Sequence, residues 1–327
     1  MRENKVVYGL IGYGGMGRWH TEILSNVPEA VIGGIYDIKE EKREEAKAKG
    51  FSVYETEEAM LADSDIDVVL IATPNDCHKP IAIRAMHAGK NVISEKPVTL
   101  SSSDLQEMEN VAKETGKFLT VHQNRRWDDD FLIIRKLVEE QKLGHVFRIE
   151  SRVHGSRGIP GDWRKEKIHG GGMVLDWGVH LLDQILYLYG DRKIETVYAS
   201  LTHITNQEVD DGFTTILTFE GGTEVLVEVG TNNYISLPRW YVLGKDGTAV
   251  IRDWQLNGEI IRKTGITEEK VVPVKTAAGL TKTMAPRRED TIVKEELPHV
   301  SGDIADFHRN VAAVIRDGAE PEIKLFQ

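Results

Sequence analysis

The first 123 residues alternate short apolar runs with helical segments, and this alternation constrains the fold more than any other feature of the sequence. One of these runs, Asp67–Ala72, is almost continuously apolar, as expected for a strand that is covered on both faces. Strands that alternate with helices imply right-handed βαβ units and a parallel sheet. We therefore predict an α/β fold in which residues 1–123 form a doubly wound parallel sheet. The expected strands are Lys5–Ile11, Val31–Tyr36, Phe51–Tyr54, Asp67–Ala72, Lys90–Ser94 and Phe118–Gln123.

After Gln123 the pattern changes, which predicts a second domain over residues 124–327. Gly172–Tyr189 has apolar residues at helical spacing, and Ile304–Arg316 reads as a final amphipathic helix. Between them strand follows strand through tight turns, which is typical of antiparallel meanders. The polar stretch Thr276–Pro298 is expected to be a surface loop. We predict an α+β domain with a large, mainly antiparallel open-faced sheet, whose strands are Phe147–Val153, Thr196–Ile204, Phe213–Phe219, Glu224–Gly230, Arg239–Leu243, Thr248–Ile251 and Glu259–Lys263.

Composition limits the classes of partner. The chain has 41 Lys and Arg against 52 Asp and Glu, a formal charge of −11, which argues against nucleic acid because binding its backbone needs clustered cations. No apolar stretch approaches the roughly 20 residues that cross a membrane, and the N-terminus lacks a secretory apolar region. Cys77 is the only cysteine, so no intrachain disulfide can form. These features favour a cytoplasmic protein that binds neither membrane nor nucleic acid.

A glycine-rich turn follows the first expected strand and predicts a dinucleotide site in a Rossmann domain. Its G-x-G-x-x-G pattern permits a tight turn, close approach of a pyrophosphate and close helix packing. Asp37 lies 20 residues after the last glycine, where a carboxylate would accept hydrogen bonds from ribose hydroxyls. A carboxylate repels a 2′-phosphate, so NAD is favoured, while Lys39, Lys42 and Arg43 leave NADP open. The cofactor residues expected here are Gly12, Tyr13, Gly14, Gly15, Met16, Gly17 and Asp37.

Two further strand ends are expected to face the nicotinamide half of the cofactor, because ligands bind at the carboxyl ends of parallel strands. Glu95-Lys96-Pro97 follows the strand Lys90–Ser94, and a lysine there would polarise a carbonyl or alcohol oxygen. An ordinary surface turn is the alternative. Small polar residues after Asp67–Ala72 could line the ribose, although Asn75 fits an N-cap equally well. These expected cofactor residues are Thr73, Pro74, Asn75, His78, Glu95 and Lys96.

Asp176 and His180 lie four residues apart on the expected helix Gly172–Tyr189, so they share one face, which Asp183 continues. One interpretation is a general acid/base pair in which His180 exchanges a proton with the substrate and Asp176 orients it. A buried pair with a purely structural role is equally compatible with the spacing. A metal site is disfavoured because no further ligand cluster accompanies the pair, so no metal is expected.

Taken in order, Gly12–Gly17, Glu95-Lys96-Pro97 and Asp176-x-x-x-His180 after Gly170-Gly171-Gly172 resemble the Gfo/Idh/MocA family of oxidoreductases over nearly the whole chain. The stretch 124–128 and the pair Trp163-Arg164 are most similar to the branch with scyllo-inositol dehydrogenases. The resemblance implies an NAD(P)-dependent enzyme acting on a secondary hydroxyl or ketone of a sugar or cyclitol, with Lys96, Asp176 and His180 as catalytic residues. It also suggests substrate-pocket candidates, namely Arg125, Arg126, Trp127, Asp162, Trp163 and Arg164.

The same resemblance implies a homodimer or homotetramer formed through the second-domain sheet. Two departures limit it: NADP-using relatives tend to lack an acid at the Asp37 position, and relatives usually continue beyond Gln327 into another helix. Two rival functions stay open, a redox-assisted glycoside-cleaving enzyme with retained NAD and a non-catalytic dinucleotide sensor. A sensor is expected to lose the Lys96 and His180 pair, which this chain keeps.

Overall fold

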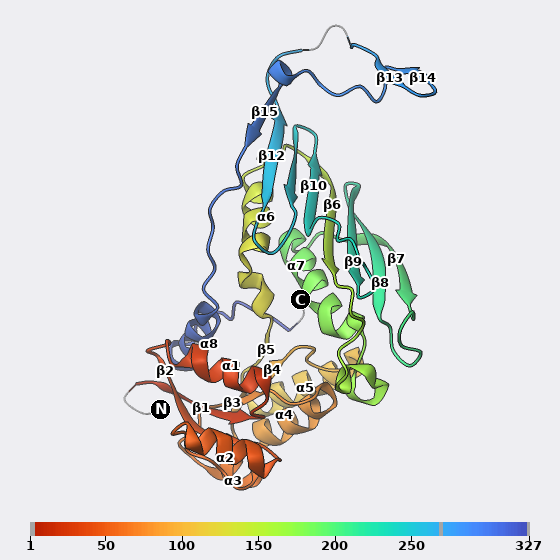
Figure 1. Ribbon diagram of the computed structural model, residues 1–327. Helices are drawn as coiled ribbons and strands as arrows, with labels where there is room; N and C mark the ends of the chain where they lie inside the picture. The colour runs from red at the N-terminus through yellow and green to blue at the C-terminus, as the bar shows by residue number, and fades with distance from the viewer. Residues whose placement is uncertain (1–3, 268–270, 326–327) are drawn as a thin grey trace.

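The computed structural model describes residues 4–267 and 271–325, and these form two sheets in separate parts of the molecule (Figure 1). The lower part in Figure 1 contains a parallel sheet of five strands in the order β2-β1-β3-β4-β5. Every residue of β1, β3 and β5 is buried, which explains why β1 and β3 read as nearly continuous apolar runs. The strand bounds are β1 Val6–Ile11, β2 Ala30–Tyr36, β3 Val68–Ile71, β4 Asn91–Glu95 and β5 Leu119–His122.

Helices cover both faces of this sheet, which confirms the doubly wound prediction. One face packs against α1 (Gly15–Leu24) and α8 (Ala305–Asp317). The other face packs against α3 (Glu57–Ala62), α4 (His78–His87) and α5 (Ser102–Thr115). The charged helix α2 spans Glu40–Ala48 and buries Ala46.

The strand expected at Phe51–Tyr54 is reduced to an isolated bridge between Ile35 and Val53. Ile35 donates to Ser52 and accepts from Tyr54, and the chain then turns away into α3. A single bridging pair is too short to extend the sheet, so this prediction was wrong about the strand and right about the position of the segment.

The upper part contains an eight-stranded sheet in the order β15-β12-β11-β10-β6-β9-β8-β7. All pairs are antiparallel except β6 with β9, which confirms a mainly antiparallel sheet. Helices α6 (Asp129–Glu139) and α7 (Val179–Tyr189) pack with its buried strand residues in one hydrophobic core. The strands are β6 Val146–His154, β7 Ile194–Thr202, β8 Gly212–Phe219, β9 Thr223–Gly230, β10 Trp240–Gly244, β11 Gly247–Ile251, β12 Gly258–Lys263 and β15 Ile292–Glu295.

The segment expected to be a surface loop, Thr276–Pro298, is more structured than predicted. A hairpin of β13 (Val274–Thr276) and β14 (Gly279–Thr281) projects from the top of the molecule (Figure 1). Farther along, β15 pairs with β12 and becomes an edge of the large sheet. Edge strands are short and carry charges, so β15, with Lys294 and Glu295, lacked the apolar run that identifies a central strand.

The final helix α8 returns to the first sheet, whereas the expected domain division placed all of residues 124–327 in one domain. Phe307, Val311 and Ala312 of α8 belong to the same core as Val6 and Tyr8. The domain boundary near residue 123 therefore stays a prediction. The helix α8, however, packs in the core of the first domain.

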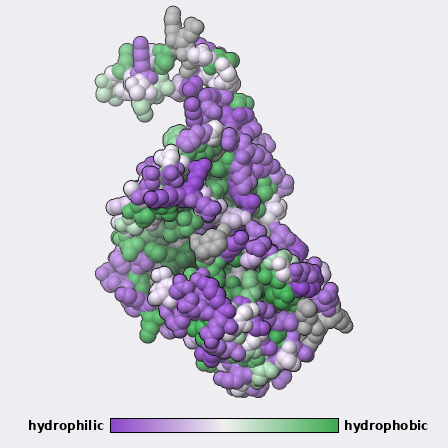
Figure 2. Space-filling view, turned by 180° about the vertical axis from the view of Figure 1, so that it is seen from behind, coloured by the Kyte–Doolittle hydropathy of each residue, from purple (hydrophilic) through white to green (hydrophobic). Residues whose placement is uncertain are grey.

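Short helices occupy the connections between the two parts. They are the 3₁₀ turns η1 Asn75–Cys77, η2 Asn124–Trp127, η3 Trp163–Lys165 and η4 Lys167–His169, and the π-helical turn η5 Val174–Gly178, whereas a further 3₁₀ turn, η6 Glu289–Thr291, directly precedes β15. In the view from behind, hydrophobic residues gather around the middle of the molecule, and the outer ends are mostly hydrophilic (Figure 2). Within the described residues, no helix is both long and apolar enough to cross a membrane.

Candidate active site

The glycine-rich turn between β1 and α1 has the shape that a pyrophosphate requires. Gly12 has a φ of +96°, and a Cβ there would clash with the carbonyl oxygen of Ala72. A Cβ on Gly17 would clash with the carbonyl oxygen of Gly12, so the third glycine permits the close helix packing. By contrast, a Cβ on Gly14 or Gly15 would meet no described atom within 4 Å. Space therefore lies beside the N-terminus of α1, where a diphosphate would approach backbone N–H groups.

The other two residues of this loop differ in role. The Tyr13 side chain is fully buried and packs edge-on against Phe51, so only its backbone faces the loop. Met16 is 38% exposed beside the empty space at Gly15. The sequence pattern identified both positions without separating the core residue from the surface one.

Asp37 stands at the carboxyl end of β2 and is held by the loop itself. Its Oδ2 accepts a hydrogen bond from the Tyr13 amide at 2.7 Å, and its Oδ1 accepts from the Lys39 amide at 2.8 Å. Each carboxylate oxygen has a further lone pair, so ribose hydroxyls can still bind there.

Two of the three cations near Asp37 that would favour a 2′-phosphate, Lys42 and Arg43, are already paired with acids. Lys42 Nζ lies 2.9 Å from Glu45, and Arg43 lies 3.5 Å from Glu55. These contacts lower the positive charge offered to a phosphate at this position.

The loop after β3 makes contact with the second part of the chain. Asn75 is buried and donates from Nδ2 to the Gly170 carbonyl at 3.0 Å, so it fastens the two parts together. His78 is also buried, between the carbonyls of Pro97 and Thr73 at 2.8 and 3.0 Å. Thr73 and Pro74 keep partial or full exposure and remain able to contact a ligand.

Lys96 follows β4 and reaches across to the second part of the molecule. Its Nζ donates to the carbonyl oxygen of Asp176 at 2.9 Å and lies 3.2 Å from Asp176 Oδ1. Its backbone amide donates to Glu95 Oε2 at 3.1 Å, which fixes the start of this turn. An ammonium group has three N–H donors, so one remains for another acceptor.

Asp176 lies in the π-helical turn η5 directly before α7, not in a continuous α-helix as predicted. Such turns occur frequently at functional sites. Its Oδ2 forms an ion pair with Arg164 Nε at 3.2 Å, in addition to its contacts with Lys96. Among the described residues no hydrogen bond joins Asp176 to His180, so the expected direct pairing of these two side chains is not what the structure shows.

His180 begins the first turn of α7 and is only 4% exposed. Within the described part of the chain, its Nδ1 is buried and has no hydrogen-bond partner. Burial lowers the pKa of His180 well below its usual value, and the nearby charges of Lys96 and Arg125 lower it further. The imidazole is therefore neutral near pH 7 and able to accept a proton.

Among the substrate candidates on η2, only Arg125 reaches the surroundings of His180. Its guanidinium lies over the Trp177 ring at 4.1 Å, and Trp177 packs edge-on against His180. Arg126 instead forms a buried bidentate pair with Asp183. Trp127 packs against α8 in the first core and is also kept away from this site.

Of the candidates on η3, Arg164 alone contacts the acid of the site. Asp162 caps η3 by accepting from the Arg164 amide at 3.0 Å and also binds its guanidinium. Trp163 stacks on the same guanidinium at 4.6 Å. The three residues therefore form one unit that supports Arg164 beside Asp176.

Sequence reasoning missed an aromatic wall beside His180. Trp254 lies 5.9 Å from Trp177, and the Arg125 guanidinium lies over both rings. Gln184 orients Arg125 by donating to its carbonyl at 2.6 Å. Trp177 follows Asp176 directly and was detectable in principle, whereas Trp254 comes from the β11–β12 connection and gave no local signal.

The fold and site together define a dinucleotide-binding oxidoreductase, and comparison with known proteins gives its family. Residues 6–123 match the oxidoreductase family with an NAD-binding Rossmann fold, and residues 131–250 match the GFO/IDH/MocA C-terminal domain. The chain belongs to this Gfo/Idh/MocA family, and its first domain is an NAD-binding Rossmann domain.

Individual relatives cover most of the chain. An NAD-binding protein from Listeria innocua has a solved structure with a TM-score of 0.94, 49% identity, and coverage of 99% of this chain and 93% of that one. The scyllo-inositol 2-dehydrogenase (NADP(+)) IolW of Bacillus subtilis (strain 168) is 28% identical over 95% of this chain and 86% of its own length. Some other matches are partial: the uncharacterized oxidoreductase YdgJ of Escherichia coli (strain K12) is 36% identical over 56% of this chain and 53% of that protein.

Proposed function

We propose that the protein is an NAD(P)-dependent dehydrogenase that interconverts a secondary hydroxyl and a ketone on a sugar or cyclitol. The observation that carries the proposal is the contact of Lys96, from the first domain, with the turn that leads directly into the buried, neutral His180. The similarity to a protein named as an inositol dehydrogenase supports the class of substrate.

The residues of the glycine-rich turn fit a dinucleotide, because free space lies at Gly14 and Gly15 and an anchored carboxylate lies at Asp37. The bound nicotinamide would supply the hydride acceptor or donor. We propose NAD as the cofactor on account of Asp37, with NADP as the alternative that the experiment below compares. The remaining contacts with the dinucleotide are proposed to come from the edges of these loops, at Met16, Thr73 and Pro74.

Lys96 is proposed to hold the reacting oxygen. Two of its N–H donors are directed to Asp176, which fixes the ammonium in place and leaves the third for the substrate. A positive charge beside this oxygen favours the partial negative charge that develops during transfer.

His180 is proposed as the general base of the oxidation and the general acid of the reverse reaction. Because its imidazole is neutral, it can take the hydroxyl proton at the start of the oxidation. Asp176 is proposed to act indirectly, because its ion pairs hold Lys96 and Arg164 in position. Arg125 and the Trp177 ring are proposed as the wall that orients the sugar ring.

A panel of polyols and sugars, offered with NAD and separately with NADP, tests this function. The absorbance of the reduced nicotinamide reports turnover, and the proposal expects net reduction with at least one cyclitol or sugar alcohol. Cleavage of a glycoside without net reduction would replace the proposal by a redox-assisted lyase or hydrolase. Dinucleotide binding without turnover of any compound would favour a sensor.

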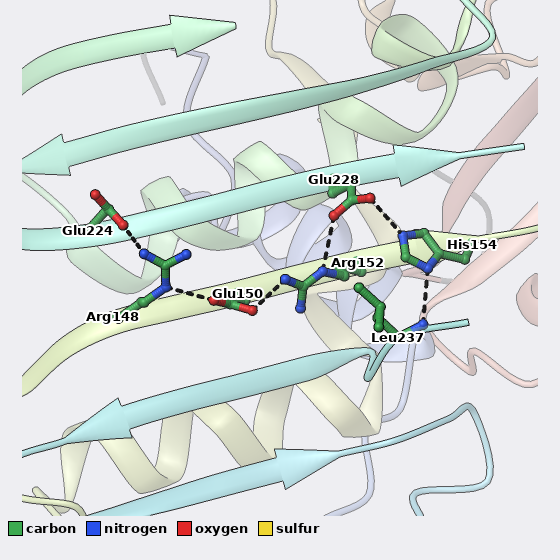
Figure 3. Close-up of polar contacts among 7 residues, drawn as sticks. All are labelled: Arg148, Glu150, Arg152, His154, Glu224, Glu228 and Leu237. Atoms are coloured by element: carbon green, nitrogen blue, oxygen red, sulfur yellow. Dashed lines mark hydrogen bonds and ion pairs between the residues drawn. The ribbon is translucent and has the colours of Figure 1, made fainter. Parts of the chain in front are cut away.

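We further propose that the protein is a cytoplasmic homodimer or homotetramer assembled through the open face of the large sheet. This face carries a ladder of alternating charges on β6 and β9, in which Arg148 contacts Glu150 and Glu224, and Arg152 contacts Glu150 and Glu228 (Figure 3). Tyr198 of the edge strand β7, which pairs with Ile216 on this face, is 61% exposed. Light scattering after gel filtration measures the mass, and a monomer at micromolar concentration would contradict the assembly.

A further inference from the structure

Three histidines from distant parts of the chain meet inside the first domain, beside Glu95, the residue that precedes Lys96. His20 lies on α1, His122 ends β5 and His308 lies on α8, and each is 0% exposed. One nitrogen of each ring lies within 4.8 Å of a nitrogen of both other rings. The centroids of the His20 and His122 rings are 4.5 Å apart.

The outer nitrogens of these rings are held by other side chains. Glu95 Oε1 lies 2.7 Å from His20 Nε2 and 2.9 Å from His122 Nδ1. A carboxylate accepts hydrogen bonds, so each of these nitrogens carries a proton. His308 Nδ1 lies 3.4 Å from the Tyr8 hydroxyl, which can accept its proton in the same way.

The other nitrogen of each ring, here called the inner nitrogen, has no hydrogen-bond partner among the described residues. Within the described residues, His20 Nδ1, His122 Nε2 and His308 Nε2 are buried without a hydrogen bond. A buried polar atom without a partner is costly, and three of them in one cluster require an explanation. In the described part of the chain, each ring thus offers one nitrogen without a partner, and the three rings are close enough for one nitrogen of each to contact a single ion.

We propose that His20, His122 and His308 bind one divalent transition-metal ion, with Zn²⁺ as the best match, through these three inner nitrogens. Neutral imidazoles suit zinc, whose bonds to nitrogen are about 2.0–2.1 Å. Tetrahedral geometry then places ligand nitrogens about 3.4 Å apart, which lies inside the 4.8 Å limit observed here. This proposed site departs from the expectation that the chain binds no metal, which was argued from Asp176 and His180.

The surroundings match the second shell of a metal site. Metal-bound histidines usually donate their other N–H to a carboxylate or similar acceptor, which fixes the tautomer. Glu95 does this for two ligands and adds a negative charge beside the ion, while Tyr8 contacts the third. The ion would thus tie α1, which follows the glycine-rich turn, to β5 and α8. Its role is structural, since the ligands are fully buried.

Metal content and stability test the site without any assay of dehydrogenase activity. The purified protein is stripped with a chelator, dialysed and titrated with Zn²⁺, and with Co²⁺ for its visible absorption. We expect one ion per chain, a higher midpoint of thermal unfolding, and a Co²⁺ spectrum of a low-coordinate nitrogen site. A stripped protein that binds neither ion stoichiometrically and shows no rise in the midpoint would overturn the proposal.

Substitutions of single residues test which side chains bind the ion. His308→Gln should weaken Zn²⁺ binding by more than about 100-fold, because losing a ligand should exceed the roughly 10–100-fold effect of an outer-shell change. Tyr8→Phe should weaken binding by about tenfold. His87→Gln, on the exposed end of α4, is the matched control and should leave binding unchanged. Equal binding by His308→Gln and the wild type would also overturn the site, and if His308→Gln fails to fold, the wild-type titration decides.

Discussion

Lys96 connects the two parts of the molecule at the level of a single side chain. Two N–H groups of its ammonium donate to Asp176, and its positive charge helps to lower the pKa of His180. In the proposed mechanism, this arrangement would let a lysine that is fixed in position and a histidine with a lowered pKa act on one substrate oxygen.

Replacement of Lys96 by alanine should lower kcat by about 100-fold or more, because the reacting oxygen loses its hydrogen-bond donor. Binding of the dinucleotide, measured by fluorescence titration, should change little. Lys136→Ala, on the outer side of α6, is the control and should retain full turnover. Wild-type turnover in Lys96→Ala would remove Lys96 from the mechanism.

The rate of oxidation should fall at low pH as His180 becomes protonated. Burial, followed by the charges of Lys96 and Arg125, lowers the pKa of His180, whereas the charge of Glu95 raises it. A base with a lowered pKa stays active to lower pH, so the acid limb of kcat/KM should lie below the usual histidine pKa of about 6.5.

The Lys96→Met variant should move the His180 titration to higher pH, because it removes a positive charge that disfavours the imidazolium. Nuclear magnetic resonance of the His180 ring measures this shift directly, even where the variant has lost its turnover. Lys136→Met is the matched control. An unchanged titration in Lys96→Met would show that the two groups do not interact.

Asp37→Asn should change the cofactor preference towards NADP by about tenfold in kcat/KM, equivalent to about 1.4 kcal/mol. The substitution removes the charge that repels a 2′-phosphate but keeps an oxygen to accept from the Tyr13 amide. Parallel kinetics with both cofactors measure the ratio. A preference equal to that of the wild type would show that Asp37 does not select the cofactor.

At the scale of single residues, the sequence predicted those candidate site residues that a local sequence pattern marks. The glycines, Asp37 and Lys96 each follow a strand, and strand ends of a parallel sheet converge by topology. The expected Asp176–His180 pair was wrong because the spacing assumed a regular α-helix, whereas the π-helical turn directs Asp176 to Lys96 and Arg164. The histidine cluster was invisible because its members are brought together only by tertiary packing.

At the level of elements, η2 and α7 are joined by the bidentate pair of Arg126 and Asp183. The side chains are 2% and 9% exposed, and both oxygens of Asp183 accept hydrogen bonds from Arg126, which also donates to the Glu322 carbonyl. Removing one partner of such a pair leaves a buried charge without compensation.

Arg126→Met should therefore lower the free energy of unfolding by about 3–5 kcal/mol, as measured by urea denaturation. The double variant Arg126→Met/Asp183→Leu should recover most of this loss, because no unpaired charge remains. Arg135→Met, which removes a more exposed pair with Glu139, should cost less than about 1 kcal/mol. A double variant that is no more stable than the single one would contradict this explanation.

Periodicity identified most helices and strands, since their burial patterns follow the apolar runs. Strand β9, for example, alternates strictly between buried and half-buried residues. Prediction failed where the neighbouring strand, and not the segment's own sequence, decides whether the segment pairs into a sheet. Phe51–Tyr54 has a strand-like composition but bridges a single residue, and Ile292–Glu295 has a weak pattern but completes a sheet edge.

For the whole molecule, the chain crosses between its two parts more than once. It leaves the first sheet after β5, builds the large sheet, and returns through α8 to the first core. Asn75 and Lys96 add direct contacts between the parts near the proposed site. Sequence periodicity could not show this return, because an amphipathic helix does not specify which sheet it covers.

The central claim is that Lys96 and His180 meet at one substrate oxygen beside the nicotinamide. A crystal structure of the complex with NAD and a substrate or unreactive analogue tests it most directly. The account predicts that Lys96 Nζ and a ring nitrogen of His180 both lie at about 3 Å from the same oxygen. A complex in which either group points away from that oxygen, with the cofactor bound at the glycine-rich turn, would contradict it.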